Sequence, residues 1–128
     1  MPVKVSPTEA HRLMVEEGFV YVDVRSAPEF AEGRPAGAVN VPIANMTVTG
    51  LEPNPSFVEH VRGLFPDLAT RLVVGCKGGG RSARARELLA AAGYTTVHDQ
   101  RAGWDGARGV FGEITEAGWR RTSLPREP

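Results

Sequence analysis

The 128-residue sequence contains a single cysteine, Cys76. A disulfide within the chain is therefore impossible, and a zinc site built from several cysteines is excluded as well. A redox pair of thiols is ruled out too, because there is no second cysteine to resolve the first. The three histidines are scattered along the sequence, so we expect no metal site. A lone cysteine is either an inert core residue or a nucleophile, and its surroundings decide between the two.

The chain also lacks an excess of charge of either sign and any long apolar run. Fifteen basic and fifteen acidic side chains give a formal net charge of zero, which argues against nucleic acid or an anionic membrane as a partner. No stretch approaches the roughly 20 apolar residues that span a bilayer. No apolar signal segment follows residues 1–4, so we expect a cytoplasmic protein. Residues 1–128 are expected to form one domain, ordered from about 3 to 122, with a fraying tail.

Apolar patterns along the chain predict strands that alternate with helices. Segments rich in apolar and β-branched residues predict strands over residues 3–5, 19–24, 38–41, 71–75 and 95–98. Capping signals and 3.6-residue periodicity predict helices over 7–17, 26–33, 56–65 and 81–92. Residues 47–55 and those beyond Gln100 read as loops. This alternation indicates an α/β domain with a mostly parallel sheet. Ligands bind at the carboxyl ends of such strands, which is where Cys76 falls.

Cys76 opens a glycine-rich loop between a buried strand and a helix. The loop reads Cys76-Lys77-Gly78-Gly79-Gly80-Arg81-Ser82. It contains no proline, so every residue keeps its backbone N–H, and three glycines allow these groups to turn inward. The following helix adds the positive end of its dipole, and two basic side chains add full charges. All of these features favour a bound anion, and a cysteine thiolate is an anion.

Such a site suits covalent transfer of sulfur. The Cys76 thiolate could attack the outer sulfur of a small anionic donor such as thiosulfate and release sulfite. The resulting persulfide would then give its outer sulfur to a thiol, to cyanide or to a sulfur-relay protein. This chemistry needs no metal and no organic cofactor.

The loop resembles the active-site loop of a known family. Cys76-x4-Arg81-Ser82 after a strand is similar to the six-residue loop of rhodanese domains, and residues 23–42 and 93–104 resemble two further stretches of that family. The resemblance implies one rhodanese-like three-layer domain with a central five-stranded, mostly parallel sheet flanked by helices. It implies that Cys76 carries the persulfide and that the rest of the loop binds substrate. The basic loop is more like thiosulfate-using than mercaptopyruvate-using members.

The same resemblance assigns supporting roles outside the loop. Asp23 is expected to accept hydrogen bonds from backbone N–H groups, and Arg25 to pair with Glu29. The alternative is that Asp23 and Arg25 serve a site, because Asp23 also ends a strand. Trp104 either walls the pocket or fills the core. His98 ends a predicted strand, so it is expected near the pocket, although the sequence offers no partner for a catalytic triad.

Four other interpretations compete with sulfur transfer. Cys76 could be a buried small hydrophobe beside an ordinary tight turn. Cysteine-dependent phosphatases and arsenate reductases also cradle an anion, but the resemblance calls for five residues between Cys and Arg where this chain has four. Gly75-x4-Gly80-Arg81-Ser82 could be a nucleotide-binding loop, although Arg81 stands where lysine is expected. A rhodanese-like module that only binds partners is the fourth possibility.

Overall fold

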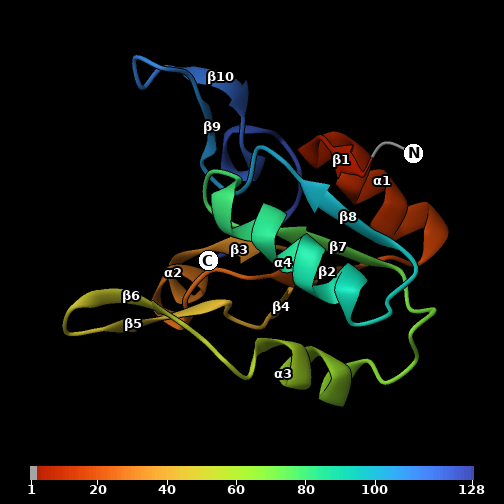
Figure 1. The fold of residues 1–128 in the computed structure, drawn as a ribbon. Coiled ribbons are helices and arrows are strands. Elements are labelled where there is room, and N and C mark those ends of the chain that lie inside the picture. Colours follow the sequence, from red (N-terminus) through yellow and green to blue (C-terminus); the bar gives the residue numbers. More distant parts are fainter. Residues whose placement is uncertain (1–2) are drawn as a thin grey trace.

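A sheet of five parallel strands lies at the centre of the computed structural model, which describes residues 3–128 (Figure 1). The strand order is β1 (Lys4–Val5), β8 (Val97–Gln100), β7 (Leu72–Gly75), β2 (Val20–Asp23) and β4 (Val39–Asn40). The central strand β7 pairs in parallel with β2 on one side and β8 on the other. The predicted α/β fold with a five-stranded sheet is therefore confirmed, and the sheet is parallel throughout.

Helices cover both faces of the sheet and give it three layers. They are α1 (Pro7–Glu17), α2 (Ala27–Glu32), α3 (Phe57–Leu64) and α4 (Gly80–Ala91). Helices α3 and α4 pack on one face, where Leu72 and Val74 of β7 belong to the larger apolar core. Helix α1 packs on the other face, where Val73 joins a second core. Successive residues of a strand point to opposite faces, so one strand supplies both cores.

The predicted helix starts agree with the local chemistry. The Ser6 hydroxyl accepts the N–H of Glu9 at the start of α1, with Pro7 in the first helical position. Ser26 begins α2, where both its N–H and its hydroxyl donate to the carboxylate of Glu29. These contacts satisfy donors that a helix start otherwise leaves unpaired.

Two antiparallel hairpins lie where loops were expected. Strands β5 (Ala44–Thr47) and β6 (Gly50–Pro53) form one, and β9 (Gly106–Arg108) and β10 (Ile114–Ala117) form the other. Both project from the body of the molecule (Figure 1). Their strands are short and mostly solvent-exposed or half-buried. They therefore lack the apolar pattern by which a buried strand is identified.

The segment after residue 122 was expected to fray, but the structure docks it. Strand β11 (Arg126–Glu127) pairs antiparallel with β3 (Arg34–Pro35). A short 3-10 helix, η1 (Trp119–Arg121), precedes it, and the fully buried Trp119 donates its indole N–H to the Pro125 carbonyl at 2.9 Å. This anchor accounts for the ordered tail. Within residues 3–128, none of the helices has the length and apolar character needed to cross a membrane.

Candidate active site

The Cys76 loop joins the carboxyl end of β7 to the first turn of α4. Gly79 precedes α4 with a φ of +108°, in the region that favours glycine. Its backbone N–H donates to the Cys76 Sγ at 3.0 Å. Several successive amides were expected to face the sulfur. Of the loop amides in the described chain, that of Gly79 alone makes this bond.

Close packing of two backbone segments holds the loop in this shape. The carbonyl of Cys76 accepts the N–H of Trp104 at 2.8 Å, and the carbonyl of Lys77 accepts the N–H of Asp105 at 2.9 Å. A Cβ on Gly79 would lie 2.6 Å from the Arg101 carbonyl oxygen, and one on Gly103 would lie 2.5 Å from the Lys77 carbonyl oxygen. Both positions therefore require glycine, and the turn after β8 packs against the Cys76 loop and fixes its conformation.

Gln100, at the end of β8, shapes that turn from inside the protein. Its side-chain oxygen accepts the N–H groups of Ala102 and Gly103, both at 2.9 Å. Its amide nitrogen donates to the Gly103 carbonyl and to the Tyr21 hydroxyl. The side chain is fully buried, so these partners compensate for its desolvation.

Ser82 and Asp99 form a chain of side-chain contacts that leads from the Cys76 sulfur into the protein interior. The Ser82 hydroxyl oxygen is 3.5 Å from the Cys76 Sγ and 2.6 Å from a carboxylate oxygen of Asp99. Both side chains are buried, and Asp99 is 2% exposed. Burial raises the pKa of Asp99, while the Ser82 hydroxyl and the charges of Lys4 and Arg86 act in the opposite direction. No sequence pattern singled out Asp99, although its place one residue before the end of a sheet strand is the available signal.

The ion pairs around the loop differ from those expected. Arg81 binds Glu29 through two contacts of 2.7 and 2.9 Å, and this guanidinium lowers the pKa of Glu29 to about 2. The predicted pairing of Arg25 with the Glu29 carboxylate is therefore wrong. The Arg25 guanidinium instead binds Asp23 at 2.7 Å and reaches only the Glu29 backbone carbonyl. Asp23 accepts the Arg25 N–H, as expected, and both side chains of the Asp23–Arg25 pair are buried.

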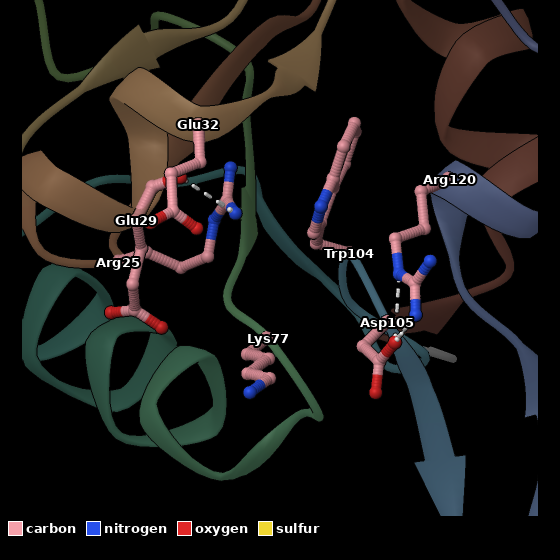
Figure 2. A pocket seen from close by; sticks show the side chains of 7 residues that line it. All are labelled: Arg25, Glu29, Glu32, Lys77, Trp104, Asp105 and Arg120. Atoms are coloured by element: carbon pink, nitrogen blue, oxygen red, sulfur yellow. Dashed lines mark hydrogen bonds and ion pairs between the residues drawn. The ribbon is translucent and has the colours of Figure 1, made fainter. Parts of the chain in front are cut away.

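A polar cavity of about 290 Å³ opens beside the loop. Figure 2 shows its seven lining residues, with acidic side chains of α2 on one side and an ion pair on the other: Arg25, Glu29, Glu32, Lys77, Trp104, Asp105 and Arg120. Arg25 and Lys77 lie two residues beyond the ends of β2 and β7, and Trp104 and Asp105 lie four and five residues beyond the end of β8. Trp104 lines the cavity and also packs against the Arg25 guanidinium, 5.1 Å from its ring centre. Both suggested roles of Trp104 therefore apply.

Asp105 holds a cluster of arginines at the rim of this cavity. Its carboxylate contacts Arg108, Arg120 and Arg121, and these guanidinium groups lower its pKa well below the ordinary value. Three positive groups around one negative group leave an excess of positive charge beside Lys77, the exposed neighbour of Cys76. This side of the cavity is suited to an anion.

His98 lies away from the site, so its expected place near the pocket is wrong. The residue is in the middle of β8 and its ring stacks on Phe19 at 5.4 Å, on the face covered by α1. Asp99, the next residue, points to the opposite face. Within residues 3–128, His, Cys, Asp and Glu side chains form no group of three that could hold a metal ion.

Comparison with known proteins gives a consistent result. The rhodanese-like domain family matches residues 6–108. Thiosulfate sulfurtransferase 16 from the chloroplast of Arabidopsis thaliana is 42% identical over 99 residues, which are 77% of this chain and 81% of that protein. The senescence-associated protein DIN1 of Raphanus sativus is 35% identical over 77% of this chain, which spans only 53% of that relative.

A solved structure supports the same assignment at the level of the fold. The Rv0390 protein of M. tuberculosis has a TM-score of 0.78 and 27% identity, with 97% of this chain and 96% of that chain covered. The family match contains four of the five central strands and the whole Cys76 loop. The chain therefore belongs to the rhodanese-like sulfurtransferase family.

Proposed function

We propose that the protein moves a sulfane sulfur from thiosulfate, or a similar small anionic donor, to a thiol, to cyanide or to a sulfur-relay protein. A persulfide on Cys76 is the intermediate. The observation that carries the proposal is the hydrogen bond from the Gly79 N–H to the Cys76 sulfur, at the N-terminus of α4. A backbone donor and a helix N-terminus both favour an anionic sulfur. Relatives named thiosulfate sulfurtransferase support the same reaction.

The reaction proceeds in two displacements. In the first, the Cys76 thiolate attacks the outer sulfur of thiosulfate, the sulfur–sulfur bond of the donor breaks, and sulfite leaves with the bonding electrons. In the second, an acceptor thiolate or cyanide attacks the outer sulfur of the persulfide. The Cys76 thiolate is then the leaving group, so the enzyme returns to its starting state without any external oxidant or reductant.

The residues of the Cys76 loop have different roles in this reaction. The Gly79 N–H stabilises negative charge on the sulfur. Lys77 lines the cavity next to Cys76 and is placed to attract an anionic donor. Arg81 is engaged by Glu29, so its main effect is to fix the loop against α2, with its charge still near the sulfur. The cavity provides room for a small donor or for the end of a larger acceptor.

Mass spectrometry tests the proposal directly. After incubation with thiosulfate and removal of excess reagent, the wild-type protein should carry one added sulfur atom, and a thiol should remove it. Cys76→Ser should remain folded and unmodified, because serine is not ionised in this site. A Cys76→Ser protein that gained the same sulfur would contradict the persulfide mechanism. A folded wild-type protein that stayed unmodified would favour a binding module instead.

A further inference from the structure

The Ser82 hydroxyl has one proton and three neighbouring acceptors. The Asp99 carboxylate is nearest at 2.6 Å, the Gly79 carbonyl is at 3.1 Å, and the Cys76 sulfur is at 3.5 Å. A distance of 2.6 Å is characteristic of a hydroxyl that donates to an ionised carboxylate, which is roughly twice as strong as a neutral hydrogen bond. The proton therefore points toward Asp99, and a lone pair of the hydroxyl oxygen faces the sulfur.

This arrangement favours an uncharged sulfur. A thiol can donate its proton to the oxygen of Ser82, whereas a thiolate would meet a lone pair in place of a donor. The Asp99 charge lies at most about 6 Å from the sulfur along this chain of contacts, so like-charge repulsion acts in the same direction. The Gly79 N–H and the Asp99 carboxylate thus have opposed effects on the sulfur, because the Gly79 N–H donates to it and favours the anion.

Other charged or titratable groups face this buried chain from each neighbouring element. Lys4 of β1 and Arg86 of α4 lie near Asp99. Arg81 of α4 and Tyr21 of β2 lie near Cys76. The Arg86 Nε donates to the Val97 carbonyl, and among residues 3–128 no basic side chain forms an ion pair with Asp99. The hydrogen bond to Ser82 is therefore the main direct side-chain contact of this carboxylate.

We propose that Asp99 is a positioning residue that acts through Ser82 to keep the Cys76 sulfur uncharged between transfers. It holds the hydroxyl proton away from the sulfur, which stabilises the thiol and also the neutral inner sulfur of a persulfide relative to the free thiolate. By disfavouring the thiolate, the Asp99–Ser82 contact makes Cys76 a poorer leaving group, so a persulfide keeps its outer sulfur for longer. This part of the proposal rests on the proposed function. The part that concerns the thiol does not depend on any sulfur donor.

The pH dependence of alkylation tests the thiol directly. The rate of reaction with iodoacetamide is followed from pH 5 to 10 in the wild type and in Asp99→Asn, which removes the charge at nearly constant size. The midpoint for Asp99→Asn should be lower by about one to two pH units. Glu87→Gln is the matched control, because it removes a negative charge from an exposed position of α4 and should leave the midpoint unchanged. An unchanged midpoint in Asp99→Asn would overturn the proposal.

Ser82→Ala tests whether Asp99 acts by positioning the Ser82 hydroxyl or by its charge alone. The same variant tests the proposal if Asp99→Asn does not fold. Loss of the acceptor for the thiol proton should lower the midpoint, whereas a rise would mean that Ser82 donates to the thiolate, contrary to the proposal. In the Ser82→Ala background, Asp99→Asn should shift the midpoint much less than in the wild type. Equal shifts in both backgrounds would show that Asp99 acts without Ser82.

Sulfur loading is measured separately on the same variants. Loaded Asp99→Asn should pass its sulfur to a small thiol severalfold faster than the loaded wild type, because its thiolate leaves more readily. If neither the wild type nor any variant took up sulfur from thiosulfate, the proposed function would be refuted. The alkylation midpoints would still test the effect of Asp99 on the Cys76 thiol. Loading that succeeds with equal release rates would refute the role of Asp99 in retaining sulfur.

Discussion

The backbone conformation of Gly79 gives the sharpest test of how the loop activates its cysteine. Gly79 has a φ of +108°, and a Cβ there would lie 2.6 Å from the Arg101 carbonyl oxygen. Gly79→Ala should therefore force the loop to move, since a residue with a Cβ in such a conformation costs on the order of 1–3 kcal/mol. Movement would break the 3.0 Å hydrogen bond from the Gly79 N–H to the Cys76 sulfur.

The expected effect on reactivity follows from that hydrogen bond. A bond to a charged acceptor contributes about 1.5–3 kcal/mol, which corresponds to a roughly ten- to hundredfold smaller fraction of thiolate at a given pH. Alkylation and sulfur uptake from thiosulfate should both slow by that factor near neutral pH. The difference should shrink at high pH, where the thiol ionises without help. The alkylation midpoint of Gly79→Ala should accordingly move upward.

Gly80→Ala is the matched control for this experiment. Gly80 is the first residue of α4, its φ is not in the positive region, and a Cβ added there would meet no atom within 4 Å. Alanine there should leave reactivity unchanged and should stabilise the helix slightly, by about 0.5–1 kcal/mol. Thermal unfolding confirms that both variants are folded at the assay temperature. If Gly79→Ala reacted as fast as Gly80→Ala, the backbone donor would not be what activates Cys76.

Three further perturbations follow from the same geometry. Lys77→Ala should lower kcat/KM for thiosulfate about two- to fivefold, because an exposed charge contributes modestly to binding. The decrease should be larger at low salt, where the charge is less screened. Equal kinetics in Lys77→Ala and in the exposed control Arg84→Ala would show that Lys77 does not bind the donor. The Glu29–Arg81 pair lowers the pKa of Glu29 from 4.5 to about 2, so its stabilisation is complete above pH 4.5 and is lost as the pH falls through 2. Urea unfolding of Glu29→Gln should therefore show a smaller loss of stability than the wild type between those values, and parallel curves would contradict the pairing. Gln100→Leu should lower the free energy of unfolding by about 1–3 kcal/mol, because the buried Ala102 N–H loses its acceptor and the Gly103 N–H keeps only the longer bond to the Gln100 backbone carbonyl; a melting temperature equal to that of the wild type would show that the turn does not need the side chain.

The order of elements and the loop could be predicted because local patterns determine them. Helix starts at Ser6 and Ser26 have caps within three residues of the chain, and the buried strands have continuous apolar runs. The glycine-rich segment after the predicted strand 71–75 indicated that Cys76 begins the functional loop, and Gly79 within it has a positive φ. Each of these features depends on residues that are close together in the sequence.

Contacts between distant residues could not be predicted in the same way. The Glu29–Arg81 pair joins residues 52 positions apart, and the Ser82–Asp99 contact depends on the register of β8 against β7. A shift of one residue in that register would exchange the faces of His98 and Asp99, and the predicted strand did in fact end two residues early. The likeness to the family assigned Glu29 to Arg25, whereas the structure pairs its carboxylate with Arg81.

The short outer strands of the central sheet have a consequence for self-association. Strands β1 and β4 are two residues long, and Pro42 follows β4 closely, so neither edge offers a run of free backbone groups to another molecule. The β5–β6 hairpin differs, because Met46, Val48 and Leu51 on it are exposed. Val110 and Phe111, between β9 and β10, are exposed in the same way. Aggregation at high concentration should therefore begin at the two hairpins rather than at the sheet, and Val48→Lys should reduce it without touching Cys76.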